Sequence, residues 1–159
     1  MTTDQHETFM QMAIDLAIEG MNNNIGGPFG CIVVKDGIVV GKGCNSVAST
    51  NDPTAHAEVV AIRDACKNLS TFQLEGCFIY TSCEPCPMCF GAIYWARPAK
   101  VYYGCTKQDA AAYQFEDDFI YKELDLAYND RAIPHYQCNR KESLKVFKAW
   151  KEKTDKTLY

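Results

Sequence analysis

Two short blocks of the chain carry side chains that could bind a metal ion. The first is His56–Glu58 (HAE), and the second is Pro85–Cys89 (PCPMC), which places two cysteines three positions apart. Residues three apart on a helix share one face, so Cys86 and Cys89 can chelate a single ion. With His56 they form a Cys₂His set that leaves one position open, as in catalytic zinc sites. Structural zinc sites instead take all four ligands from the protein.

Glu58 lies two positions after His56, where a carboxylate can act on a water at the open position. Bound zinc can lower the pKa of such a water to about 7, and a nearby carboxylate can take its proton and pass it on. Two positions along a regular helix turn a side chain by about 200°. The local geometry of a first turn can still direct Glu58 to the water. Both blocks are expected near the N-terminus of a helix. The positive end of the helix dipole lies there and favours thiolates and developing negative charge.

The remaining cysteines allow other interpretations. If Cys83 also bound the ion, the site would be a closed, structural Cys₃His site, but Glu58 would then have no function, and Glu84 and Pro85 separate Cys83 from the predicted helix. A thioredoxin-like redox pair is less consistent with prolines both before and within the pair. The other six cysteines are expected to be buried free thiols: Cys31, Cys44, Cys66, Cys77, Cys105 and Cys138.

Apolar spacing and turn signals predict the elements that must position these blocks. Helical spacing predicts a first helix over residues 6–22, and Asp36-Gly37 predicts a hairpin between strands that begin near Phe29 and Ile38. Asp52 suits an N-cap and Pro53 a first helical position, so a second helix is expected from there to about residue 68. It carries the first block.

A strand at 77–81, a helix at about 85–96 and a strand at 101–104 follow in this order. This succession predicts a parallel pair of strands joined by a crossover helix that carries the second block. A last helix is expected over 143–153, and residues 133–137 could be a strand or a loop. Residues 1–159 therefore read as one three-layer α/β/α domain.

The composition is that of an ordinary globular protein, with 47% hydrophobic and 23% charged residues. No apolar run approaches the roughly 20 residues of a membrane helix, and residues 1–7 lack a signal-peptide pattern, so we expect a cytoplasmic protein without a membrane partner. The net charge of −4 argues against a nucleic-acid partner, because phosphate binding usually requires a basic face.

The pattern H-x-E…P-C-x-x-C is the signature of zinc nucleobase deaminases. The chain resembles the cytidine-deaminase-like superfamily, and within it the bacterial guanine deaminases, over essentially its whole length. The matching stretches are Gly26–Gly30 (GGPFG), Asn51–Glu58 (NDPTAHAE), Thr81–Cys89 (TSCEPCPMC), Gly91–Pro98 (GAIYWARP), Phe115–Glu123 and the terminal Tyr159.

This resemblance implies a mixed five-stranded sheet between helices, one Zn²⁺ per subunit and a homodimer. It also implies that the C-terminal segment, about residues 130–159, is swapped onto the partner and covers its active site. An apolar last helix and an aromatic tail, which need a surface to bury against, agree with such a swap.

Carried over by position, the resemblance also implies the pocket residues. Phe29 would stack on a purine, Asn45 would bind the ring edge, Trp95 would help wall the pocket, Asp117 would handle the amine and Tyr159 would close the site. The expected reaction is the hydrolysis of guanine to xanthine and ammonia, with Glu58 and Asp117 as catalytic residues. The alternatives are deamination of guanosine, of cytosine or cytidine, or of adenosine in transfer RNA, and a non-catalytic module stabilised by zinc.

Overall fold

The computed structural model describes residues 2–158. The chain divides into two compact units, Met1–Asp117 and Asp118–Tyr159, and each is described by itself. No helix in the described range combines the length and apolar character that crossing a membrane requires. The first unit holds both motif blocks.

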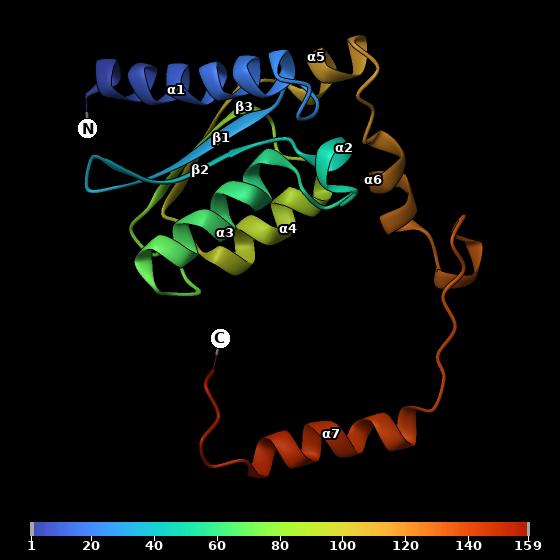
Figure 1. The fold of residues 1–159 in the computed structure, drawn as a ribbon. Coiled ribbons are helices and arrows are strands. Elements are labelled where there is room, and N and C mark those ends of the chain that lie inside the picture. The colour runs from blue at the N-terminus through green and yellow to red at the C-terminus, as the bar shows by residue number, and fades with distance from the viewer. Residues whose placement is uncertain (1, 159) are drawn as a thin grey trace. The chain divides into compact units, whose positions relative to one another are not determined.

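The first unit is built on a four-stranded mixed sheet in the order β2-β1-β3-β4 (Figure 1). Its strands are β1 (Gly30–Lys35), β2 (Ile38–Cys44), β3 (Phe78–Cys83) and β4 (Lys100–Cys105). β1 pairs antiparallel with both β2 and β3, whereas β3 and β4 are parallel. Asp36 and Gly37 both have positive φ, at 50° and 78°, as a two-residue type I′ hairpin requires. The predicted hairpin and parallel pair are thus confirmed.

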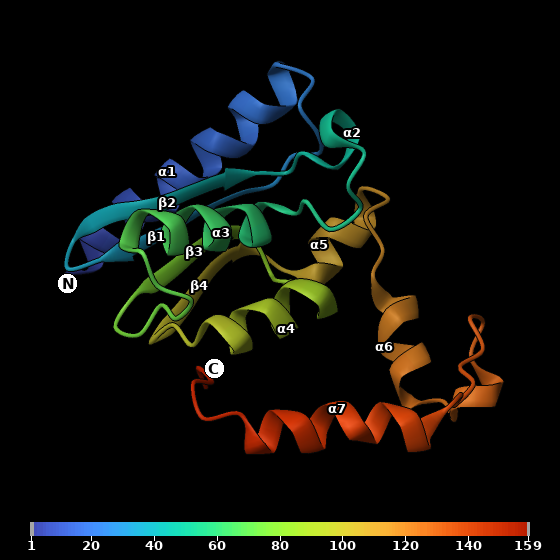
Figure 2. The same cartoon turned by 60° about the horizontal axis from the view of Figure 1, so that its bottom comes forward.

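Helices cover both faces of this sheet, which confirms the three-layer α/β/α architecture (Figure 2). Residues of β1 alternate between two cores, as the period of two in a strand dictates. Ile32 and Val34 pack under α1 (Thr3–Asn22), while Cys31 and Val33 pack under α3 (Ala57–Leu69) and α4 (Pro87–Ala96). β1 is therefore the buried centre of the unit.

The chain before α3 differs from the expectation. Asp52 does not cap a helix, because its carboxylate accepts hydrogen bonds from the backbone and hydroxyl of Thr54 in a local turn. A four-residue helix, α2 (Val47–Thr50), precedes this turn, and α3 begins only at Ala57, with His56 as its N-cap. His56 has an extended backbone, so the 200° separation of a regular helix does not apply between it and Glu58.

The implied fifth strand is wrong for the described residues. After β4 the chain forms α5 (Lys107–Ala112), and the second unit consists of α6 (Asp118–Asp125), a 3₁₀ turn (Tyr128–Asp130) and α7 (Arg140–Glu152). Residues 133–137 form no strand. The capping box of Thr106 and Asp109 starts α5 immediately after β4, so the chain leaves the sheet there.

The expected burial of the single cysteines is only partly correct. Cys31 and Cys77 are buried, and Cys44 and Cys66 are half-buried. Cys105 and Cys138 are exposed. Cys105 ends the edge strand β4 and Cys138 lies in a loop, so neither has a core to enter.

Candidate functional site

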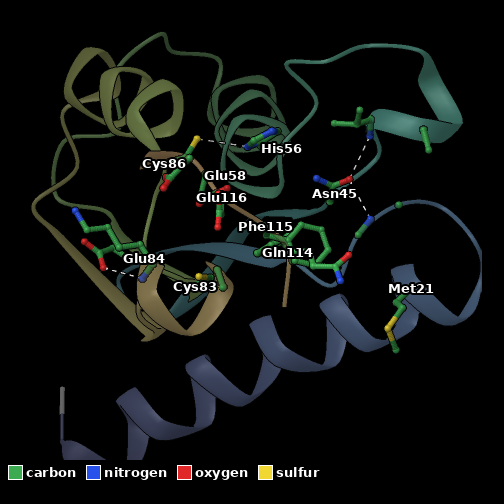
Figure 3. Close-up of a pocket in the computed structure, with 18 of the residues that line it drawn as sticks. Met21, Asn45, His56, Glu58, Cys83, Glu84, Cys86, Gln114, Phe115 and Glu116 are labelled. Carbon is green, nitrogen blue, oxygen red and sulfur yellow. Dashed lines mark hydrogen bonds between the residues drawn. The ribbon is translucent and has the colours of Figure 1, made fainter. Parts of the chain in front are cut away.

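The two blocks bring His56, Cys86 and Cys89 together at the N-termini of α3 and α4. The Nδ1 atom of His56 lies 3.5 Å from the Cys86 Sγ (Figure 3) and 3.6 Å from the Cys89 Sγ. A tetrahedral zinc ion with ordinary Zn–N and Zn–S bonds holds such ligands about 3.5 Å apart. In the described part of the chain this trio is the one set of three such side chains arranged for a metal. The residues present therefore fit zinc.

Helix starts position two of these ligands. His56 is the N-cap of α3 and Cys86 the N-cap of α4, and neither side chain caps its own helix. Pro87 follows at the first helical position, where its missing N–H costs no hydrogen bond. Both side chains are thus directed away from their helices and remain available as ligands.

The surroundings of Cys86 favour the thiolate that a metal site needs. Hydrogen bonds with the Cys89 thiol and with His56 outweigh the effect of burial and lower the pKa of Cys86 to about 4. The same contact with Cys86 raises the pKa of His56. The N-terminus of α4 adds a positive dipole end, which also stabilises a thiolate.

Glu58 is the carboxylate of this site. It lies in the first turn of α3, is only 6% exposed and accepts a hydrogen bond of 3.3 Å from the Cys89 thiol. Burial raises its pKa, because the charged form loses hydration. A carboxylate with a raised pKa beside an open metal position suits proton transfer near neutral pH.

Cys83 lies outside the ligand trio. Its thiol contacts the carbonyl of Thr106 at 3.6 Å, at the ends of β3 and β4. Burial raises the pKa of this thiol to about 11, so it stays protonated at neutral pH. The geometry agrees with an open Cys₂His site and not with a closed Cys₃His site.

A cavity of about 790 Å³ opens on the trio. Its walls include His56, Glu58 and Cys86, with Asn45 on another side (Figure 3), and Phe29 also lines it. The cavity lies entirely within the first unit. Its volume is ample for a small heterocyclic substrate.

Hydrogen bonds fix the orientation of the Asn45 side-chain amide. Its Oδ1 accepts hydrogen bonds from the backbone N–H groups of Gly27, at 3.2 Å, and Val47, at 3.4 Å. The amide nitrogen therefore points to the cavity as a donor (Figure 3). Gly26 permits this contact, because a Cβ there would lie 2.2 Å from the Asn45 carbonyl oxygen.

The other implied pocket residues are placed differently. Asp117 lines the cavity, and burial raises the pKa of its carboxyl. Trp95 does not line it: it is 67% exposed and lies in the last turn of α4, whereas the cavity opens at the first turn. Trp95 is therefore not part of the wall of this cavity in the single chain, and its expected role stays a prediction. Tyr159 lies outside the described residues.

The cavity is also lined by residues that the sequence did not single out as site residues, among them Glu84, Lys107, Gln114 and Phe115. Glu84 accepts a hydrogen bond of 3.0 Å from the Lys107 backbone and joins the end of β3 to the start of α5. The signal for Phe115 was its place beside Glu116 and Asp117, an aromatic residue in an acidic run.

Comparisons with known proteins agree with this site. Residues 3–105 match the model of the cytidine and deoxycytidylate deaminase zinc-binding region. The chain is 55% identical to the guanine deaminase of Bacillus subtilis over 97% of its own length and 99% of the relative's. The crystal structure of that enzyme superposes with a TM-score of 0.95, over 97% of this chain and 98% of the other.

Two further relatives are more distant. A transfer-RNA-specific adenosine deaminase of Aquifex aeolicus is 50% identical over 46% of this chain and 49% of its own. The structure of a guanine deaminase from Nitrosomonas europaea is 30% identical and superposes with a TM-score of 0.67, over 70% of this chain and 64% of that one. The likeness to a guanine deaminase thus extends over nearly the whole chain, whereas that to the Aquifex protein stops short of half.

Proposed function

The chain belongs to the cytidine and deoxycytidylate deaminase family, and from this premise we propose that it hydrolyses guanine to xanthine and ammonia with zinc as cofactor. The observation that carries the reaction class is the placement of Glu58, buried beside the trio of His56, Cys86 and Cys89 at the cavity. The near full-length likeness to a guanine deaminase supports the choice of substrate.

We propose that His56, Cys86 and Cys89 hold one zinc ion per chain. When bound, zinc acidifies a water molecule and polarises the substrate, which makes attack possible at neutral pH. The chain itself supplies two thiols and an imidazole at ligand spacing and a buried carboxylate within reach of the open position.

Glu58 then moves the protons of the reaction. It takes a proton from the attacking water and passes it to N3 of the base as the new C–O bond forms at C2. A second proton must reach the 2-amino group before the C–N bond breaks, and it comes from Glu58 or from Asp117. Burial keeps both carboxyl pKa values raised, so each group can accept and return a proton.

Asn45 and Phe29 orient the base. The Asn45 amide presents a donor to the cavity, and guanine carries acceptors at O6 and N7. An adenine-type edge presents an amino group in place of O6, so a fixed donor favours guanine. Phe29, half-buried on the cavity wall, offers an aromatic face for stacking.

Ammonia release tests the choice of substrate. We expect the zinc-loaded protein to release ammonia from guanine and far more slowly from guanosine, cytosine, cytidine or a transfer-RNA anticodon arm. Each substrate is compared at equal concentration with a no-enzyme control. Faster release from any of these than from guanine would overturn the substrate assignment, and no release from any of them would overturn the reaction class.

We also propose that the chain forms a homodimer in which the C-terminal segment covers the partner's site. The described helices of the second unit, α6 and α7, bury no residue, although both have an apolar face. On α7 the large apolar residues Val146 and Phe147 are 69% and 71% exposed. Such faces need a partner surface, and a second copy would provide one.

A mixing experiment tests this swap. A chain with Glu58→Gln has an inactive site but an intact tail, and a chain with Tyr159→Ala has an intact site but an altered tail. If tails cover partner sites, co-refolding the two should restore part of the activity that each lacks, and light scattering should give twice the mass of one chain. A monomer, or no recovery on mixing, would contradict the swap.

A further inference from the structure

We propose that Phe115 is a substrate-binding residue: with Phe29 it forms an aromatic wall that contacts the flat ring of the substrate. This inference rests on the proposed function, because it assumes that the cavity receives a planar base. In this role Phe115 contributes to substrate affinity and takes no part in proton transfer.

The two rings lie side by side on the cavity wall and contact each other. The Phe29 and Phe115 rings lie 5.0 Å apart between centroids and meet edge to face at 87°. Both side chains line the cavity that contains Glu58. A Cβ added at Gly27 would lie 3.4 Å from Phe29 and 3.6 Å from Phe115, so the backbone of Gly27 lies close to both rings.

The backbone holds Phe115 in this place although it follows the end of α5. Gln114 adopts a left-handed conformation with φ of 70°, which is uncommon for a residue with a side chain. The turn brings the Phe115 N–H to 3.1 Å from the carbonyl of Ala110. Together with the hydrogen bond from the Gln114 N–H to the Ala111 carbonyl, this contact forms the Schellman motif that ends α5 and directs Phe115 back to the cavity.

Phe115 remains 43% exposed in this arrangement, so its ring is not part of the core. A purine that enters beside Phe29 would replace the edge-to-face contact with stacking on one ring and contact with the other. Stacking of a base on an aromatic side chain increases binding affinity by about tenfold or more. An exposed ring is free to make this change.

The alternative is that Phe115 only supports the loop that carries Asp117, two residues later. The two roles differ in kinetics. Loss of a substrate wall weakens binding and raises KM, whereas displacement of Asp117 slows the chemical step and lowers kcat.

Steady-state kinetics with guanine separates these roles. We expect Phe115→Ala to raise KM about tenfold with kcat nearly unchanged, and Phe115→Tyr to restore KM. Tyr113→Ala is the matched control, because Tyr113 is 78% exposed near the same turn and does not line the cavity. Its KM should equal that of the unchanged protein.

Binding measured without turnover keeps this test independent of the proposed reaction. In a Glu58→Gln background, Phe115→Ala should weaken calorimetric binding of guanine by the same factor, with zinc content and melting temperature unchanged. Unchanged binding, or a fall in kcat at constant KM, would overturn the role of Phe115. If the unchanged protein binds guanine but releases no ammonia from it, the proposed reaction fails while the aromatic wall stands.

Discussion

Replacement of Glu58 by glutamine is expected to abolish turnover while the zinc content stays at one ion per chain. Glutamine keeps the shape of the side chain but cannot carry a proton between water and substrate. Proton transfer by a positioned side chain contributes about 10²–10⁴-fold to a rate, and Glu58 is proposed to act in at least two transfers. The expected loss in kcat is therefore at least about a thousandfold. Ammonia release and zinc analysis on the same preparation measure both quantities.

Glu116→Gln is the matched control for this variant. Glu116 is an exposed carboxylate on the wall of the same cavity, so the change removes an equal charge close by. It should leave kcat close to that of the unchanged protein. Substantial residual turnover in Glu58→Gln would contradict the role of Glu58, and a larger loss in Glu116→Gln would transfer that role to the second carboxylate.

Replacement of Cys89 by serine is expected to remove both zinc and activity. Cys89 is fully buried in the first helical turn after Cys86, and its Sγ lies 3.6 Å from the His56 nitrogen. A serine hydroxyl is a poor zinc ligand at neutral pH. Loss of a partner outside the ligand shell already costs a metal enzyme about 10–100-fold, so loss of a ligand should exceed that range. Zinc analysis after gel filtration and ammonia release check this.

Cys83→Ser distinguishes a trio from a four-ligand site. Cys83 is equally close to the motif in sequence, but its thiol contacts the Thr106 carbonyl. This variant should therefore retain one zinc ion per chain and most of its activity. If it instead loses zinc as Cys89→Ser does, the site is a closed Cys₃His site, and the open position that the chemistry needs does not exist.

The sequence was most informative where the chemistry depends on local spacing. Cys86 and Cys89 lie one helical turn apart, and this relation holds wherever the helix packs. The hairpin at Asp36-Gly37 and the parallel pair of β3 and β4 were predictable for the same reason, because turn chemistry and element order determine them.

Features that depend on distant parts of the chain were less predictable. Asp52 and Pro53 favoured a helix start by their own preferences, but the turn at Thr54 satisfies Asp52 and delays α3 to Ala57. This delay makes His56 an N-cap, which no spacing rule indicated. The orientation of the Asn45 amide likewise depends on a hydrogen bond from Gly27, eighteen residues earlier.

The pocket walls illustrate the same limit. Trp95 was assigned by resemblance, yet it lies at the end of α4 that is remote from the cavity. Phe115 was passed over, because an aromatic residue in an acidic run does not reveal which surface it covers. Only the left-handed turn at Gln114 brings it against Phe29.

Hydrolysis of guanine in water enriched in oxygen-18 tests the central proposal most directly. The zinc-loaded protein should yield one ammonia per guanine and xanthine that carries a single heavy oxygen, bound at C2, as mass spectrometry with fragmentation can establish. The same incubation with Glu58→Gln should yield neither product. Unlabelled xanthine, or no xanthine from a protein with one zinc ion per chain, would contradict hydrolytic deamination of guanine at this site.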